Sequence, residues 1–140
     1  MKIEGTSILA AGALLAVGMA SGVWKWRAMV RSPERRAPMY VDILHRASLL
    51  YASATLVLGH LAAASAFSAT LNRGAFWTAY FYFVVTLVVY AFHGIRRTER
   101  TMFTQRNLVT GPGVALLVVG ELGSTLLLLV GAALGEGCAP

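Results

Sequence analysis

Long apolar stretches alternate with shorter polar ones along the chain. A hydrocarbon core about 30 Å thick is crossed by roughly 20 apolar residues in helical form. Four stretches approach that length, at residues 8–23, 43–67, 76–92 and 114–134. The pattern therefore predicts an all-α integral membrane protein, a four-helix bundle in which residues 1–140 form a single transmembrane domain.

The first apolar stretch, residues 8–23, is short and rich in glycine and alanine. A cleaved secretory signal peptide is therefore an alternative interpretation of this N-terminal part. We favour a retained helix, because Glu4 balances Lys2, the apolar run is long for a signal peptide, and basic residues follow it.

Lysine and arginine concentrate in two connections. The first holds Lys25, Arg27, Arg31, Arg35, Arg36 and Arg46, and the second holds Arg96, Arg97, Arg100 and Arg106. Only Lys2 and Arg73 belong to the other side. The positive-inside rule thus predicts both connections in the cytoplasm and both termini outside, for a multi-pass protein of the inner (cytoplasmic) membrane. The net charge of +6 accordingly indicates contact with anionic lipid headgroups, and we expect no nucleic acid partner.

Histidines in the apolar stretches are informative, because a polar group in lipid costs free energy unless it is paired or used. His45 begins the second predicted helix and His93 ends the third. Since these helices run antiparallel, we expect both rings at the cytoplasmic surface, where they could face each other. His60 lies about 22 Å further toward the outside. Two facing imidazoles bind a haem iron axially in membrane cytochromes, whereas a lone histidine more often makes a hydrogen bond between helices.

Glu121 is the other ionisable residue within a predicted span. Its neighbours Gly120, Gly123, Ser124 and Thr125 are small or polar, which allows close helix contact and polar pairing. Desolvation favours the neutral form of such a carboxyl group. Two roles remain open: a proton relay or cation site, and a structural hydrogen bond that pairs two helices.

Two short motifs resemble the cytochrome b membrane-anchor subunit of succinate dehydrogenase and fumarate reductase. In that family ILHRxSG begins the first conserved span, a histidine and then GIRH close the second, and a third span completes the subunit. The residues of this chain that match are Ile43, Leu44, His45, Arg46 and Ser48, followed by Gly94, Ile95 and Arg96. The likeness covers the second to fourth helices and leaves the first as an addition.

The resemblance implies a quinone site at the cytoplasmic face, beside an iron-sulfur subunit that delivers electrons. The family's arginine corresponds to Arg46, and Asp42 is closest to the place of its quinone serine. Arg46 and His45 can donate hydrogen bonds to a quinone carbonyl, and Asp42 can pass protons during reduction.

Haem b is the further cofactor that the resemblance implies, with His45, His93 and His60 as candidate ligands and no other metal. The sequence departs from the family here, because Tyr90 stands at the position of the family's haem histidine and His93 lies on a different face of the helix. GIRR replaces GIRH, and Leu49 replaces the glycine of the first motif.

Two other classes of function remain open. The chain contains no Gly-rich phosphate loop and no Cys/His cluster with metal-ligand spacing, so any oxidoreductase activity would belong to a complex in which it is a subunit. The first alternative is an accessory or assembly subunit of a membrane complex without redox chemistry. The second is a small transporter that uses Glu121.

Overall fold

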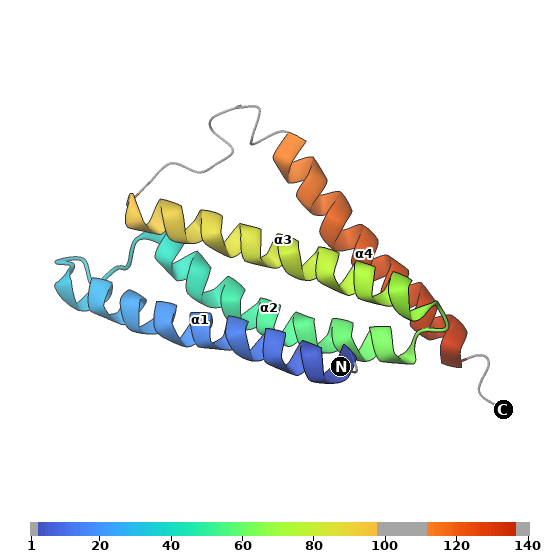
Figure 1. The fold of residues 1–140 in the computed structure, drawn as a ribbon. Coiled ribbons are helices and arrows are strands. Elements are labelled where there is room, and N and C mark those ends of the chain that lie inside the picture. Colours follow the sequence, from blue (N-terminus) through green and yellow to red (C-terminus); the bar gives the residue numbers. More distant parts are fainter. Residues whose placement is uncertain (1–2, 98–111, 137–140) are drawn as a thin grey trace.

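The computed structural model describes residues 3–97 and 112–136, and this part of the chain consists of helices without strands (Figure 1). The helices are α1 (Ile3–Arg31), α2 (Met39–Ala64), α3 (Ala69–Ile95) and α4 (Pro112–Glu136). All four are long and apolar enough to cross a membrane. The predicted all-α, four-helix membrane fold is therefore confirmed.

All four helices begin before the predicted spans, and three of them also end after those spans. The first helix continues past residue 23 to Arg31, and α3 begins at Ala69 rather than at residue 76. Hydropathy marks only the part of a helix that lies in hydrocarbon, whereas the hydrogen-bonded helix continues into the headgroup layer. The end of α2 differs in the other direction: it lies at Ala64 rather than at residue 67, because Ser65 takes an extended backbone conformation.

The connections are short where the structure describes them. Residues 32–38 join α1 to α2, and Pro38 directly precedes α2. Residues 65–68 join α2 to α3, where the hydroxyl of Ser68 accepts a hydrogen bond from the Leu71 N–H and caps α3. Pro112 is the first residue of α4, a position that favours proline because the N–H that proline lacks would be unpaired there in any helix. Arg100 and Arg106 lie outside the described residues.

Helices α1 and α2 pack closely through small side chains. The buried residues on α1 recur at intervals of three and four, and they face a similar series on α2. The two series include Ser7, Ala11, Leu14, Gly18 and Ser21 on α1, and Ser48, Ala52, Thr55, Gly59 and Ala62 on α2. A Cβ atom on Gly59 would overlap the side chain of Ser7. Because lipid supplies no hydrophobic force between helices, this close contact depends on small residues.

The third helix completes the core, and α4 lies across it. Phe76, Ala79 and Phe83 are among the buried side chains on α3. Figure 1 shows α4 crossing α3 obliquely, with its carboxyl end beside the α2–α3 turn, where the N–H of Ala66 donates to the Gly131 carbonyl at 2.9 Å. The N-terminal end of α1 and the carboxyl end of α4 lie at the same end of the molecule (Figure 1).

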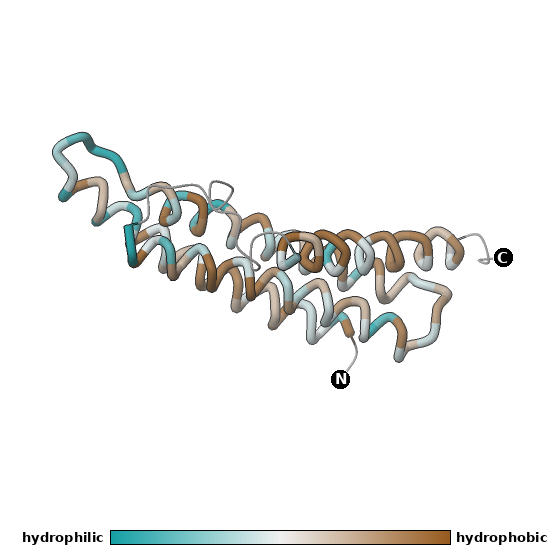
Figure 2. Tube along the Cα trace, turned by 90° about the horizontal axis from the view of Figure 1, so that it is seen from above, coloured by the Kyte–Doolittle hydropathy of each residue, from teal (hydrophilic) through white to brown (hydrophobic). Residues whose placement is uncertain are grey.

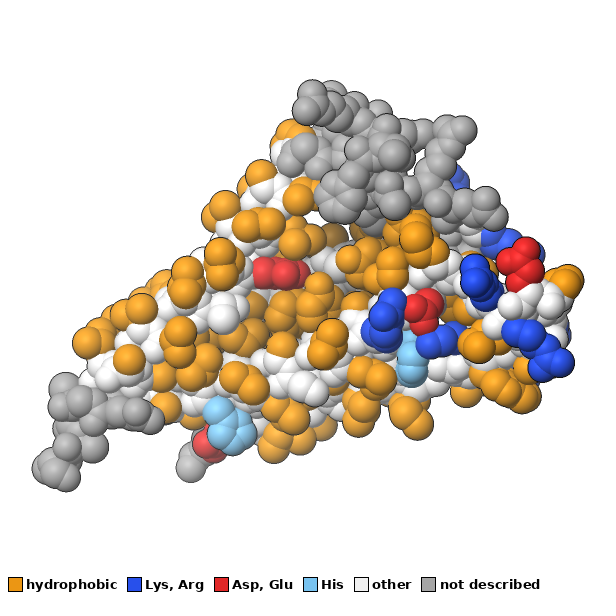
Figure 3. All heavy atoms as spheres, turned by 180° about the vertical axis from the view of Figure 1, so that it is seen from behind, with side chains coloured by type: hydrophobic (Ala, Val, Ile, Leu, Met, Phe, Trp, Pro, Cys, Tyr) orange, Lys and Arg blue, Asp and Glu red, His pale blue; other side chains and the backbone are white. Residues whose placement is uncertain are grey.

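Charge and hydropathy differ between the two ends. The helices are largely apolar along their length, and the most hydrophilic segment is at the α1–α2 connection (Figure 2). Lysine and arginine side chains gather at that same end, which we call the basic end, whereas most of the coloured side chains on the rest of the visible face are hydrophobic (Figure 3). This surface suits contact with membrane lipids. That the basic end faces the cytoplasm stays a prediction from the positive-inside rule.

Candidate functional site

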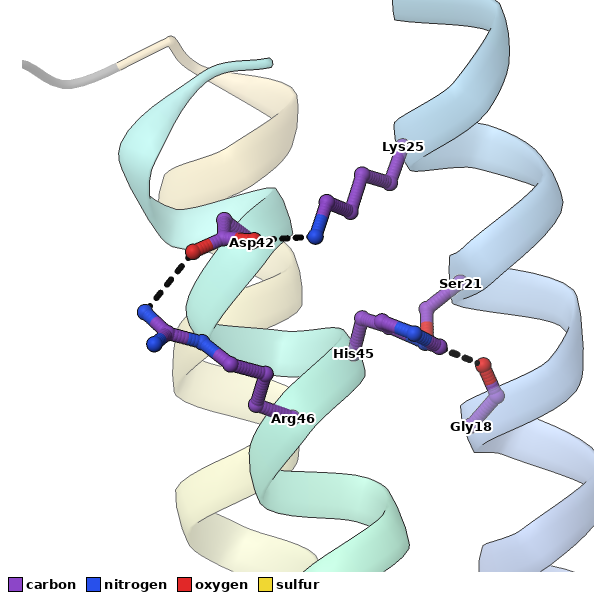
Figure 4. Close-up of polar contacts among 6 residues, drawn as sticks. All are labelled: Gly18, Ser21, Lys25, Asp42, His45 and Arg46. Carbon is purple, nitrogen blue, oxygen red and sulfur yellow. Dashed lines mark hydrogen bonds and ion pairs between the residues drawn. The ribbon is translucent and has the colours of Figure 1, made fainter. Parts of the chain in front are cut away.

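Asp42 links α1 to α2 at the basic end (Figure 4). Its Oδ1 lies 2.5 Å from Nζ of Lys25, and its Oδ2 lies 2.7 Å from Nη2 of Arg46, one helical turn later on α2. The Arg46 side chain is 66% exposed, whereas those of Lys25 and Asp42 are about 30% exposed. An exposed ion pair contributes at most about 1 kcal/mol, so the main effect of Asp42 is to orient the two cations.

The imidazole of His45 points toward α1 (Figure 4). Its Nδ1 lies 2.9 Å from the carbonyl oxygen of Gly18. Because a carbonyl only accepts, Nδ1 carries the proton and donates, which leaves Nε2 of the neutral ring as an acceptor. Gly22 makes room for the ring, since a Cβ atom there would lie 2.9 Å from Cε1. The ring is therefore held in one orientation by the backbone of α1.

The structure brings together three of the predicted site residues and adds others. Asp42, His45 and Arg46 lie close together at the start of α2 (Figure 4). Lys25 and Gly18 were missed, because the motif comparison treated the first helix as an addition. A signal was present in the sequence: small residues precede Lys25 at positions 18, 21 and 22, which lie on the same helix face.

The expected face-to-face arrangement of His45 and His93 is not found. His45 lies against α1, whereas the ring of His93 stacks on Tyr40 with a centroid distance of 4.9 Å. His60 is exposed on α2 toward the other end, and its Nδ1 lies 3.0 Å from the Leu56 carbonyl. The three rings thus have different neighbours, because the closest helix to the His45 face of α2 is α1 and not α3.

Glu121 lies on α4, which packs against α3 and α2. Its Oε1 atom is buried and makes no hydrogen bond with any other part of the described chain. Tyr51 on α2 and Tyr90 on α3 are close enough to interact with it electrostatically. The hydroxyl of Thr125 donates to the backbone carbonyl of Glu121 at 2.7 Å, so it does not serve the carboxyl group. The expected pairing hydrogen bond is therefore not made by Oε1.

Two cavities lie at the other end of the molecule, beside the start of α1. Their volumes are about 400 and 250 Å³, and both are lined by Ile3 and Arg73. Asp42, His45 and Arg46 do not line either of them. The predicted quinone residues instead form a partly exposed surface between α1 and α2.

The described part of the chain contains no group of three or more His, Cys, Asp or Glu side chains that could hold a metal ion. Comparisons of the whole sequence with protein-family models and with curated proteins, and of the structure with solved structures, found no match.

Proposed function

We propose that this chain is the membrane-anchor subunit of a respiratory redox complex and that its basic end contributes a quinone site. One observation carries the proposal: Asp42, His45 and Arg46 converge on one surface, together with Lys25 from α1. This surface lies where the helices emerge at the basic end, which is a suitable depth for a membrane quinone and a suitable place for a soluble electron-donating subunit.

The geometry suggests how the residues would act on a quinone. Asp42 binds Arg46 through Nη2 and leaves other N–H groups of the exposed guanidinium available for a quinone carbonyl. Reduction of a quinone to a quinol takes up two electrons and two protons. Protonated His45 can donate a hydrogen bond from Nε2 to a quinone oxygen, and the neutral ring can accept one from a quinol hydroxyl. The Gly18 carbonyl keeps Nε2 in a fixed position for either step.

Haem b does not fit this arrangement as a ligand of two facing histidines. His45, His60 and His93 each contact a different part of the bundle. The proposed quinone chemistry therefore passes no electron through a haem in this chain.

The first experiment purifies the chain with its membrane complex and records a dithionite-reduced minus oxidised visible spectrum. Its subunits and quinone content are determined in the same sample. The proposal expects bound quinone and a soluble redox subunit, and any haem band should persist when His45, His60 or His93 is changed to alanine. A b-type band lost in His45→Ala, His60→Ala or His93→Ala would identify a haem ligand and overturn the haem-free account. An intact complex without quinone or redox subunit would favour an accessory subunit.

A second candidate function is favoured by the unpaired Oε1 of Glu121. The ring of Tyr90 lies 6.2 Å from that of Tyr40 between centroids, and Tyr40 stacks on His93. The side chains of Tyr90, Tyr40 and His93 thus form a series of neighbouring polar rings on the basic-end side of Glu121. A carboxyl group so placed suits a proton relay or cation site in a small transporter.

Proton flux into proteoliposomes tests this candidate. Glu121→Gln abolishes the flux if the carboxyl group relays protons, whereas Glu34→Gln, an exposed change in the α1–α2 connection, leaves it unchanged. Absence of flux above protein-free vesicles in the unaltered protein would remove the transporter from consideration.

A further inference from the structure

At the basic end, α1 extends further than the helix beside it. Lys25 of α1 pairs with Asp42 of α2, so these two residues lie at about the same level. Six residues of α1 follow Lys25, up to Arg31, whereas three residues of α2 precede Asp42. Residues 26–31, which we call the projecting end of α1, therefore reach about one helical turn past the start of α2 (Figure 1). The proposed quinone surface uses none of these six residues.

The projecting end of α1 reaches the outer limit of the headgroup layer. A charged pair is costly in hydrocarbon, so Lys25 and Asp42 mark the edge of the apolar core of the membrane. The headgroup layer adds about 5–7.5 Å on each side of that core. Val30 lies five residues after Lys25, which is about 7.5 Å along the helix axis. Lipid headgroups can therefore surround Trp26, but Val30 and Arg31 lie where the headgroup layer ends and water begins.

Large apolar side chains are exposed on this projecting end. Trp26 is 62% exposed and Val30 is 58% exposed. Because these two residues are four positions apart, they lie on one face of the helix, and the exposed Met29 lies beside them. Tryptophan, methionine and arginine are the residues that are enriched in protein interfaces. The face therefore has the composition of a surface that another protein covers.

Positive charge surrounds this apolar face. The segment 26–38 contains four exposed arginines, Arg27, Arg31, Arg35 and Arg36. The ion pairs among the described residues are those of Asp42, and none of these arginines takes part in one. Glu34 is the one acidic residue of the segment, so four positive charges and one negative charge give it a net charge of +3. A surface that complements this segment must therefore carry acidic as well as apolar side chains.

We propose that the projecting end of α1 is the docking surface for a water-soluble protein with an acidic contact surface. The inference rests on the proposed function, which requires a soluble electron-donating subunit, and it places the contact on the helix outside the matched sequence motifs. Acidic side chains of the partner pair with Arg27 and Arg31, and its apolar side chains cover Trp26 and Val30. Anionic lipid headgroups complement the same charges, but they offer nothing apolar to Val30 at the limit of the headgroup layer.

Site-specific photocrosslinking in the purified membrane complex tests the proposal. A photoreactive amino acid replaces Val30 in one variant and Val57 in the control, because Val57 is equally exposed, at 58%, but lies within the membrane span of α2. We expect Val30 to crosslink to a stoichiometric subunit without membrane-spanning segments, within a peptide rich in aspartate and glutamate. Val57 should not crosslink to that subunit. Crosslinks from Val30 only to lipid, to a second copy of this chain or to a membrane-spanning subunit, or no crosslink, would overturn the proposal.

Charge variants separate this contact from the quinone site. The soluble subunit is released from the complex at high salt and rebound to the membrane part, whose quinone content is also measured. We expect Arg27→Gln combined with Arg31→Gln to weaken rebinding about tenfold, since each exposed ion pair contributes roughly threefold. Arg73→Gln, an exposed change at the other end, is the control.

The two readouts fail independently. Equal rebinding of the double variant and the control, with quinone present in both, would overturn the docking surface and leave the proposed quinone function standing. An unaltered complex that holds the soluble subunit but no quinone would contradict the proposed function. In that complex, weaker rebinding of the double variant would still support the docking surface.

Discussion

At the residue scale, the candidate site depends on one carboxylate that orients two cations. Asp42 occupies the first turn of α2, where the helix dipole favours negative charge. It contacts Arg46 within its own helix and Lys25 across the α1–α2 interface. Asp42 therefore links Arg46, which we propose binds the quinone, to α1, the helix outside the matched sequence motifs.

Arg46 is the residue whose loss should affect quinone binding most directly. Arg46→Gln removes a charged donor from the quinone carbonyl, and we expect quinone affinity to fall about tenfold. Arg36→Gln, at the same end but without a contact to Asp42, should leave the affinity unchanged. Titration of the purified complex with a quinone analogue measures both. Equal affinities in the two variants would show that positive charge alone attracts the quinone.

Gly22 controls the position of the His45 ring. A Cβ atom at this position would lie 2.9 Å from Cε1, so Gly22→Ala displaces the imidazole from the Gly18 carbonyl. We expect nitrogen NMR of the histidine ring to lose the signature of a hydrogen-bonded Nδ1–H. Gly12→Ala, where the added methyl group meets no atom within 4 Å, is the control. An unchanged spectrum in Gly22→Ala would contradict the described ring orientation.

Part of this site could be predicted from the sequence. Asp42 and Arg46 are one helical turn apart, so their contact follows from helix geometry alone. The direction of His45 does not, because hydropathy identifies the segments that cross the membrane but not the faces through which they meet. His45 and His93 were expected to face each other for this reason, and the structure gives His45 a neighbour on α1 instead.

At the scale of elements, small residues set the distance between α1 and α2. Gly59 and Ser7 meet where no additional atom fits, and Gly18 lies against Leu49 and Ser48. Helix existence was predictable from apolar length. The helix ends were harder to predict. At the α2–α3 turn, the Ser68 hydroxyl accepts a hydrogen bond from the Leu71 N–H and the Asn72 amide donates one to the Ala62 carbonyl, and hydropathy does not register either of them.

Gly59→Ala tests this packing. The added methyl group overlaps Ser7, so α1 must move, and we expect a loss of about 1–3 kcal/mol in stability. Gly12→Ala adds the same methyl group in open space and should be neutral or stabilising by up to about 1 kcal/mol. Thermal unfolding in detergent, followed by circular dichroism, compares the two. Similar unfolding temperatures would contradict a tight contact at Gly59.

At the scale of the whole molecule, the two ends have different chemistry. The basic end carries the proposed quinone surface, and the other end carries the two cavities lined by Ile3 and Arg73. If the basic end faces the cytoplasm, the quinone surface is on the same side as soluble electron donors. The proposed function therefore requires that the basic end face the cytoplasm.

Labelling of single cysteines tests the sidedness. In a Cys138→Ser background, Thr70→Cys and Arg36→Cys place one exposed thiol near each end. An impermeant maleimide applied to intact cells should label Thr70→Cys, and it should label Arg36→Cys only after the membrane is permeabilised. The reverse pattern would place the quinone surface outside and contradict the proposed encounter with a cytoplasmic subunit.

Photolabelling with an azido-quinone locates the quinone site on this chain. The purified membrane complex is illuminated with the probe, and the labelled positions are mapped by mass spectrometry. We expect labelling within residues 18–25 or 42–46, with less labelling in Arg46→Gln than in Arg36→Gln. Labelling only at the end opposite the basic end, or none on this chain, would contradict a quinone site at Asp42, His45 and Arg46.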